Sequence, residues 1–298
     1  MSLGNAFTRL QREIGIKRCI IIDGNVDDVY FEKNRIVTLQ TKLTAILKGL
    51  NYQNVVFWDR IHGASGNTEH LNLIDETELE GDVYNDEEDD TEETVPEVTL
   101  DDPTQMFHVI LRNLNRPNQK YAFMLNWANY LFNGSASLSD EERKLLTLLG
   151  KAINEQTPKY YFSSSDEVNE SVIIIANKLS MLPLSLYQGN PEVSTVNLSK
   201  PDRLERQKML EKLQDSFNVT LKANETLTSA EHFQQYVDML DDFSNRKMIQ
   251  LAKLSMKEAK MPFDKLFLLF KYGEKENPWE QLDYQALKNI IRTCCRSE

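Results

Sequence analysis

Residues 171–206 read SVIIIANKLSMLPLSLYQGNPEVSTVNLSKPDRLER, and this stretch decides the predicted fold. Two short apolar runs, residues 171–177 and 193–198, are typical of strands covered on both faces, as in a parallel sheet flanked by helices. After Pro201 the sequence carries only helical patterns. We therefore expect a parallel sheet to end here and a helical region to begin near residue 200.

Three earlier apolar runs complete the predicted sheet. They are rich in Ile, Val and Phe and lie at residues 17–23, 54–59 and 120–126. Amphipathic helical patterns alternate with the runs, at residues 36–50, 103–114 and 139–154. This alternation predicts an α/β fold with a five-stranded parallel sheet and flanking helices over residues 1–200. A small all-helical lid domain with a connector is expected over residues 201–298.

Local signals mark the helices of the second domain. Thr228-Ser-Ala-Glu231 has the form of a capping box, and Ser244 can cap a helix that runs to about residue 257. Residues 262–272 form a short, very apolar helical pattern. Asn277-Pro278 predicts the start of a last helix, because proline is favoured at the first helical position.

The net charge of −12 comes from one segment. Residues 75–102 contain fifteen acidic residues and no Lys or Arg, so the rest of the chain is nearly neutral. Residues 67–102 combine these acids with turn residues and few apolar side chains, which predicts a disordered or loosely ordered insertion. Two interpretations stay open for it: a solvated loop without a specific role, and a docking site for a basic partner.

The composition narrows the classes of function. The sequence has no run approaching about 18 consecutive apolar residues, so we expect no membrane-spanning helix. Cys19, Cys294 and Cys295 have neither a disulfide nor a zinc spacing, which favours a reducing, cytoplasmic location. Because the body of the chain is nearly neutral, its overall charge does not favour nucleic acid as a partner.

Two stretches resemble parts of AAA+ ATPases. In residues 171–206, an apolar strand ends in the polar residue Asn177, and a later strand closes on Pro201-Asp202 and Arg206, as in the sensor-1 strand, the fifth strand and the box after it. Residues 270–283, FKYGEKENPWEQLD, resemble the connector that precedes a second, Clp-like AAA+ module in some bacterial ATPases. The resemblance implies a following AAA+ module and ring neighbours as partners.

The catalytic motifs of that family are missing. A phosphate-binding loop needs Gly-x-x-x-x-Gly-Lys-Ser/Thr after the first strand, but residues 23–30 read DGNVDDVY, with one glycine, no lysine and three carboxylates. The Asp-Glu pair expected after the third strand is replaced by Asn126 and Trp127, neither of which can serve as a general base. The module is therefore interpreted as degenerate.

A metal site in the first loop is a weaker interpretation. Asp23, Asn25 and Asp27 have the spacing of the first ligands of a calcium-binding loop. The loop glycine is misplaced, however, and strands replace the flanking helices. An Asx-rich turn is therefore the preferred interpretation, and no metal site is predicted.

The leading hypothesis is a non-catalytic interaction and assembly module of a larger, Clp-like ATPase. One alternative is a divergent AAA+ enzyme that binds or hydrolyses ATP, and another is a clamp-loader-like subunit associated with nucleic acid, which a basic stripe in the structure would favour. No catalytic residue is predicted, and at most weak binding of ATP or ADP. The positions equivalent to a nucleotide site are Gly24, Asn25, Asp27, Asn126, Asn177, Arg206 and Arg246.

Overall fold

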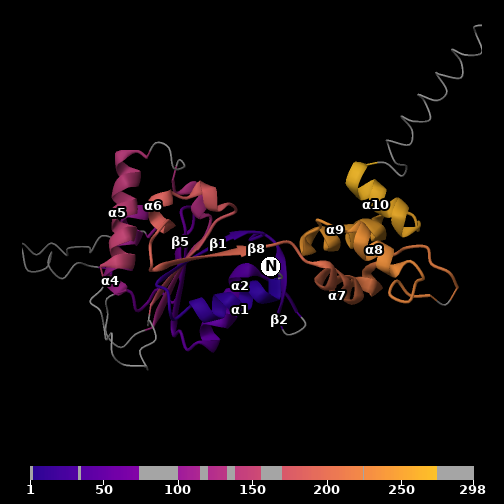
Figure 1. Cartoon of the computed structure of the whole chain (residues 1–298), viewed down its shortest axis with the longest axis horizontal. Helices are drawn as coiled ribbons and strands as arrows, with labels where there is room; N and C mark the ends of the chain where they lie inside the picture. The colour runs from indigo at the N-terminus through magenta and orange to yellow at the C-terminus, as the bar shows by residue number, and fades with distance from the viewer. Residues whose placement is uncertain are drawn as a thin grey trace, which may run out of the picture. The chain divides into compact units, whose positions relative to one another are not determined.

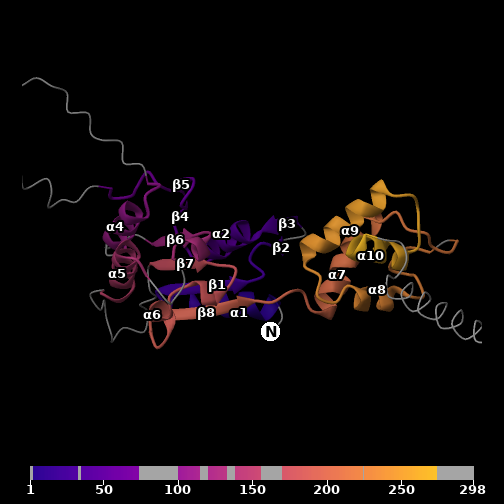
Figure 2. The ribbon, with the colours of Figure 1, turned by 90° about the horizontal axis from the view of Figure 1, so that it is seen from above.

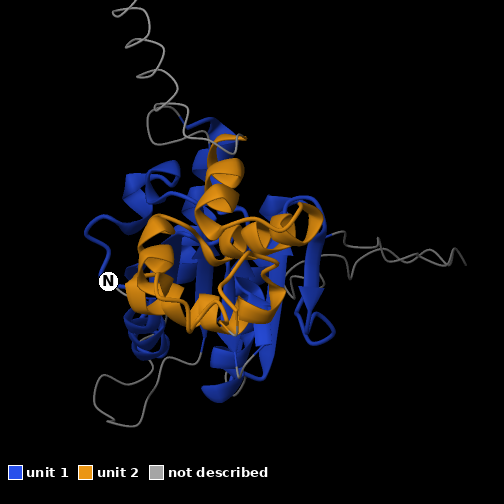
Figure 3. Ribbon diagram, turned by 90° about the vertical axis from the view of Figure 1, so that its right-hand side faces the viewer, with its two compact units in different colours: residues 1, 3–199 blue, residues 2, 200–298 orange. Residues whose placement is uncertain are grey.

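The computed structural model describes residues 3–32, 35–73, 100–114, 120–132, 138–155, 170–223 and 225–273. These residues form two compact units (Figure 3). The first unit runs from Leu3 to Ser199, and the second begins at Lys200.

The first unit is built on a mostly parallel sheet. The five predicted runs form the parallel strands β1 (Cys19–Gly24), β4 (Asn54–Asp59), β6 (Tyr121–Leu125), β7 (Ser171–Ile175) and β8 (Val193–Leu198). Figure 2 shows the strands side by side in the order β5-β4-β6-β7-β1-β8. The prediction of an α/β fold with a parallel sheet is confirmed, and β1 lies between β7 and β8.

The sheet has one strand more than the five expected. Strand β5 (Gly63–Gly66) pairs antiparallel with β4, so that Asp59 lies opposite Gly63. Its sequence, GASG, has none of the branched or aromatic residues that mark strands. The five predicted parallel strands are all present, and backbone pairing along the β4 edge adds this sixth, antiparallel strand without an apolar run.

A hairpin separates β1 from the first following helix. Strands β2 (Val29–Glu32) and β3 (Arg35–Thr38) pair antiparallel, and helix α2 (Leu39–Gly49) begins directly after them. Residues 36–38 were expected to be helical and are strand instead. The helix starts at Leu39 because the Thr38 hydroxyl caps it by accepting the N–H of Thr41.

Helices cover both faces of the sheet, as Figure 1 shows. On one face α4 (Pro103–Asn113), α5 (Asp140–Asn154) and the short α6 (Leu184–Tyr187) share one core with Cys19 and Ile21 of β1. On the other face α1 (Leu3–Glu13) and α2 share a second core with Ile20 and Ile22. Alternate side chains of one strand thus enter two separate cores, which explains why β1 is apolar throughout.

The second unit is helical, as expected. It contains α7 (Arg203–Leu213), α8 (Phe233–Met239), α9 (Asn245–Lys257) and α10 (Phe263–Tyr272). The buried Phe263 ring stacks on Tyr236, with centroids 4.4 Å apart, and so joins α10 to α8. Burial of such rings provides much of the free energy that holds a small helical bundle together.

The cap predictions in this unit have mixed outcomes. The Ser244 hydroxyl accepts the N–H of Lys247 and opens α9, as predicted. The capping box at Thr228–Glu231 is wrong, because α8 begins after His232 without a side-chain cap and the Ser229 hydroxyl is bonded to Thr226. The helix expected after Asn277 lies outside the described residues.

The acidic insertion is anchored at both ends. The backbone of Asn72 exchanges two hydrogen bonds with the buried side chain of Asn113, and the Leu73 carbonyl accepts from Arg112 at 2.6 Å. At the other end, the buried Trp58 Nε1 donates to the Leu100 carbonyl at 2.7 Å. Residues 67–73 and 100–102 therefore belong to the packed unit, and residues 74–99 lie outside the described part of the chain.

Replacing residues 76–98 by a short Gly-Ser linker is expected to leave the thermal midpoint within about 2 °C of wild type, because both anchors remain. Trp58→Phe in the same background is the matched control. It removes the donor to the Leu100 carbonyl and should lower stability by about 1 kcal/mol. A linker variant that unfolds would show instead that residues 76–98 contribute to the core.

Candidate functional site

The carboxyl ends of β1, β7 and β8 meet at the place where a P-loop fold binds phosphate. The Gly24 N–H donates to the Asn177 carbonyl at 3.2 Å, the Asn25 N–H to the Leu198 carbonyl at 2.7 Å, and the Val26 N–H to the Gly24 carbonyl at 2.8 Å. In a phosphate-binding loop, successive N–H groups of this kind point at the anion. Here all three are already bonded to protein carbonyls.

Side-chain amides hold the carboxylates of this loop. Asn177 Nδ2 donates to Asp27 at 2.5 Å, and Asn197 Nδ2 donates to Asp23 at 2.8 Å. Within the loop, Asn25 Nδ2 donates to Asp28 at 2.7 Å. Each bond satisfies a carboxylate oxygen, and two of the three tie the loop to neighbouring strands.

The hairpin of β2 and β3 also holds the loop that follows β1. The Tyr30 hydroxyl on β2 donates to the Asn25 carbonyl. Burial, followed by the nearby charges of Asp28 and Asp27, raises the pKa of Tyr30 well above its usual range. The hydroxyl is therefore protonated, and able to donate, at neutral pH.

The first lysine of α2 is also engaged. Lys42 Nζ donates to the Phe31 carbonyl at 2.7 Å and to Glu32 Oε2 at 3.2 Å, and it lies over the Phe7 ring at 4.9 Å. These contacts hold the lysine against the hairpin.

Among the described residues, no group of three His, Cys, Asp or Glu side chains is arranged to hold a metal ion.

Asn126 lies at a different place along the sheet edge. It lines a pocket of about 380 Å³ between the loops that follow β4 and β6. Trp127 has φ +56°, a left-handed conformation that is strained for an aromatic residue, and its ring stacks on Tyr130 with centroids 6.3 Å apart. Both rings are exposed, at 54% and 67%. The sequence offered no signal for this pocket beyond Trp127 itself.

A carboxylate forms the polar side of the same pocket. Asp59 Oδ1 accepts the N–H groups of Ile61 and His62, each at 2.9 Å, and His62 Nδ1 lies 3.1 Å away. Partial burial alone would raise the pKa of Asp59, but the hydrogen bonds from His62 and Ile61 outweigh it and lower that pKa. Asp59 is thus ionised and fixed at neutral pH.

Arg206 is a buried clamp of the helical unit. Its guanidinium donates to the carbonyls of Pro201, at 3.0 Å, and Val237, at 3.3 Å, and it pairs with Asp241 at 3.0 Å. These contacts join the start of α7 to the end of α8. Only 7% of Arg206 is exposed, so its hydrogen-bonding groups serve the unit itself.

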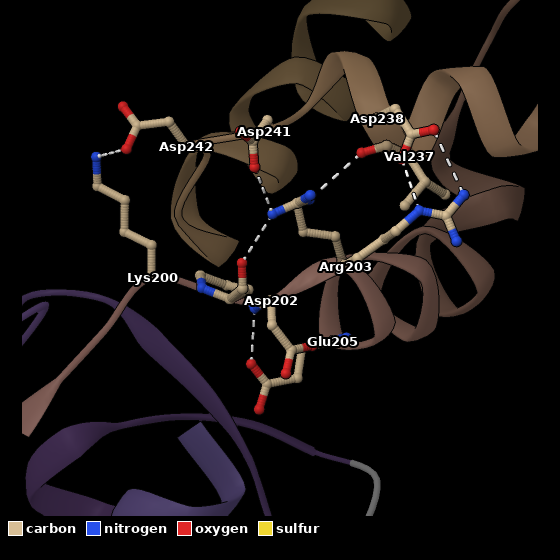
Figure 4. Close-up of polar contacts among 10 residues, drawn as sticks. Lys200, Asp202, Arg203, Glu205, Val237, Asp238, Asp241 and Asp242 are labelled. Atoms are coloured by element: carbon tan, nitrogen blue, oxygen red, sulfur yellow. Dashed lines mark hydrogen bonds and ion pairs between the residues drawn. The ribbon is translucent and has the colours of Figure 1, made fainter. Parts of the chain in front are cut away.

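Two exposed ion pairs flank the clamp. Arg203 binds Asp238 at 2.7 Å, and Lys200 binds Asp242 at 2.5 Å (Figure 4). The hydrogen bond from each cation lowers the pKa of its aspartate. Exposed pairs of this kind contribute little to stability.

The structure brings together only part of the predicted site. Gly24 and Asp27 are both hydrogen-bonded to Asn177, and Asn25, next to Gly24 in the loop, is bonded to Leu198 and Asp28. Asn197, which the sequence did not mark, holds Asp23. Asn126 lines the separate pocket. The remaining two positions, Arg206 and Arg246, lie in the second unit, where Arg206 is buried and Arg246 is exposed on α9.

Gly24→Ala is expected to destabilise the first unit by about 3 kcal/mol or more. At φ +95°, an added Cβ would lie 2.5 Å from the Leu198 carbonyl oxygen. Gly15→Ala is the matched control, because Gly15 has φ +98° but no atom within 4 Å of the added carbon. Urea unfolding that shows equal losses for the two variants would contradict the close packing of the loop.

Arg206→Met is expected to destabilise the helical unit by about 2 kcal/mol, because it leaves two buried carbonyls without a donor. Urea unfolding followed by circular dichroism measures the loss. Arg203→Met, on the exposed side of the same helix, should change little. If the two substitutions behave alike, Arg206 is not a clamp.

The comparisons with known proteins agree with this fold. The family model of the AAA+ chaperone N-terminal Rossmann-like domain matches residues 2–199. No curated protein matches the chain. Within the described residues, no helix is long and apolar enough to cross a membrane.

Two solved structures are similar over most of their length. The AAA domain of FIGL-1 in complex with ADP is 10% identical, with a TM-score of 0.47 over 97% of this chain and 90% of that chain. A chain of the E. coli MS115-1 HORMA:CdnC:Trip13 complex is 12% identical, with a TM-score of 0.51 over 93% and 89%, and this likeness concerns the fold alone. Since the family match spans the whole first unit, the chain belongs to the AAA+ chaperone family through its N-terminal Rossmann-like domain.

Proposed function

We propose that this chain is a non-catalytic AAA+ module that serves interaction and assembly in a larger, Clp-like ATPase. The observation that carries the proposal is the loop after β1. Its three N–H groups bind the carbonyls of Asn177, Leu198 and Gly24, where a phosphate cradle would direct them at an anion.

The residues at this edge do not fit a magnesium-bound triphosphate. The side chains that meet there are carboxylates and amides, and Asp27 is held by Asn177. The nearest lysine of α2, Lys42, is bonded to the hairpin. Phosphoryl transfer depends on a lysine, a metal ion and a positioned water, so we derive no hydrolytic step for this chain.

The surroundings of Asn126 support the same proposal. By the resemblance to AAA+ modules, Asn126 and Trp127 take the positions of a magnesium-binding acid and a catalytic acid. Asn126 lines an aromatic pocket, and Trp127 is exposed beside Tyr130. A strained, exposed aromatic residue suits contact with a partner better than activation of water.

In this proposal the chain acts through its neighbours. A following AAA+ module would supply hydrolysis, and further copies would surround it in a ring. Such assemblies need a stable frame and complementary surfaces, both of which a module can keep after losing its phosphate loop.

Purified residues 1–298 with Mg-ATP are expected to show turnover indistinguishable from buffer, and to bind ATP or ADP no tighter than about 1 mM. A coupled phosphate-release assay and calorimetry measure the two quantities. The test variant is Asp27→Ala with Asp28→Ala, and Asp215→Ala on the second unit is the control. Turnover that survives repurification and disappears only in the double variant would overturn the non-catalytic assignment.

A further inference from the structure

Two adjoining hollows lie beside the turn between β4 and β5. One is the pocket of about 380 Å³ that Trp127 lines. The other has a volume of about 490 Å³ and is lined by Leu73 and Leu100, at the two ends of the acidic insertion. Ile61 and His62 line both hollows, so the two adjoin. Each has the size of a site for a side chain or a small ligand, about 300 Å³ or more.

The rim of the first hollow is aromatic and apolar. Trp127 and Tyr130 stack on each other and are both exposed, and Ile61 is 81% exposed. A partner that removes such side chains from water gains free energy. Trp127 also adopts φ +56°, a conformation that few residues other than Gly, Asn and Asp visit readily. Strain of this kind is retained where the surrounding structure holds a side chain in place for function.

Asp59 adds a fixed negative charge to this aromatic rim. Its Oδ1 atom accepts two backbone N–H groups, whereas Oδ2 has one partner among the described residues, the His62 ring nitrogen at 3.1 Å. A carboxylate oxygen accepts about two hydrogen bonds. The His62 side chain is 81% exposed and is free to turn away, so Oδ2 is available to a donor that enters the hollow. A guanidinium both donates to a carboxylate and stacks on an indole, which makes arginine the side chain that fits best.

The charges that line the two hollows favour a cation. Asp59 lines the first hollow, and Glu69 and Asp101 line the second. Arg60 is the one Lys or Arg among the described residues that line them. It is exposed and forms no ion pair with a described residue, so it neutralises none of the three carboxylates. An arginine from a partner supplies the missing positive charge.

The acidic insertion adds negative charge next to this surface. It carries fifteen acids between residues 75 and 102. Asp75 and Glu97 stand two and three positions from Leu73 and Leu100, so the chain keeps them within about 11 Å of these anchors. Charge at that range attracts a basic partner and accelerates its approach. Of the two interpretations left open for the insertion, the hollows favour a role in docking a basic partner.

We propose that the two hollows bind an arginine-containing basic segment of a partner protein. The guanidinium lies against the Trp127 ring and donates to Asp59 Oδ2. Apolar side chains of the segment cover Tyr130 and Ile61, and a second cation pairs with a carboxylate of the second hollow. This assignment deepens the proposed interaction function and rests on it.

Single-stranded nucleic acid is the weaker candidate for the same surface. Exposed aromatic rings also stack on bases. The phosphates, however, would approach three carboxylates and the acids of the insertion, with Arg60 as the one Lys or Arg among the described lining residues. Nucleic-acid sites depend on cations that neutralise phosphate, and this surface has the opposite sign of charge.

Calorimetric titration of the full chain with a short peptide tests the proposal. The probe is acetyl-Ser-Leu-Arg-Ile-Arg-Ser-amide, and the matched peptide carries citrulline in place of each arginine. Citrulline has nearly the same shape as arginine and no charge. The arginine peptide should bind at least about tenfold more tightly at about 0.15 M salt. Equal binding of the two peptides, or no binding of the arginine peptide, overturns the proposal.

Two substitutions examine the residues of the first hollow. Asp59→Asn removes the charge but keeps an acceptor for the Ile61 and His62 N–H groups. It should weaken the arginine peptide at least about tenfold and the citrulline peptide by less than about twofold. Trp127→Asn removes the ring but keeps a residue that tolerates the left-handed conformation. It should weaken the arginine peptide at least about fivefold without lowering the thermal midpoint, because the strain at this position is relieved.

Matched controls make the same chemical changes elsewhere on the first unit. Glu155→Gln removes one charge at the exposed C-terminal end of α5, and Ile36→Asn replaces an exposed apolar side chain on the hairpin. Both should bind the arginine peptide like wild type, and circular dichroism establishes that every variant is folded. If the controls weaken binding as much as Asp59→Asn and Trp127→Asn do, the hollows are not the site.

The variant with a Gly-Ser linker in place of residues 76–98 separates the hollows from the insertion. It should still bind the arginine peptide, and Asp59→Asn should weaken binding in that background as well. The linker variant should lose affinity mainly at about 0.05 M salt, where long-range attraction is strongest. Complete loss of binding at both salt concentrations would place the site on the insertion and overturn the proposal.

Two further measurements separate the possible failures. A single-stranded oligothymidylate should not bind the wild-type chain, and binding that Trp127→Asn abolishes would assign the surface to nucleic acid and overturn the proposal. Phosphate release from Mg-ATP, measured on the same preparations, tests the proposed function independently. Turnover overturns the non-catalytic assignment whatever the peptide does. A chain that neither turns over ATP nor binds the peptide overturns the hollows as a docking site and leaves that assignment standing.

Discussion

At the carboxyl end of β1, next to the edge strand β8, three consecutive backbone N–H groups must be satisfied where the chain leaves the sheet. Buried N–H groups without partners are costly, so some acceptor has to be supplied. In this chain the acceptors are the carbonyls of Asn177, Leu198 and Gly24. These hydrogen bonds hold the loop against the ends of β7 and β8, and the conformation of the neighbouring residues depends on that contact.

The close approach explains the neighbouring residues. Gly24 is needed because its φ of +95° and the 2.5 Å distance to the Leu198 oxygen leave no room for a Cβ. Once the loop lies flat, its carboxylates come within reach of Asn177 and Asn197. The chain then continues as a hairpin, in which the Tyr30 hydroxyl donates to the Asn25 carbonyl of the loop. Helix α2 begins after the hairpin. Loop, hairpin and strand ends thus form one hydrogen-bonded unit.

The strands were predictable because their signal is local. Five apolar runs of five or six residues have one physical cause, burial on both faces, and each run shows it without reference to the others. Strand β5 has no such signal, since its glycines form it through pairing alone. Residues 36–38 were misassigned because Ile36 and Val37 extend the apolar pattern of α2 backwards. Only the cap at Thr38 shows where the helix begins.

The site was less predictable because its contacts are not local. Asp27 and Asn177 are separated by 150 positions, and nothing near either residue indicates the other. The missing lysine and acids were visible in the sequence, but the carbonyls that replace the phosphate oxygens were not. Arg206 illustrates the same limit. Its position suggested contact with a nucleotide, whereas burial and two backbone acceptors make it a clamp between helices.

A fold of this kind can lose its catalytic residues because they contribute little to its stability. The cores on the two faces of the sheet are made mostly of apolar side chains from strands and helices. The segment after β1 reaches one of them through Val26 and Tyr30, and not through polar residues of the kind that bind phosphate. Catalytic loops commonly store strain that the rest of the structure supports. Replacing such a strained loop by one whose hydrogen bonds are satisfied within the protein therefore removes strain, and it removes no interaction that stabilises the fold. In the proposed function, later changes act on the exposed surface, where aromatic side chains such as Trp127 and Tyr130 are available for contact with a partner.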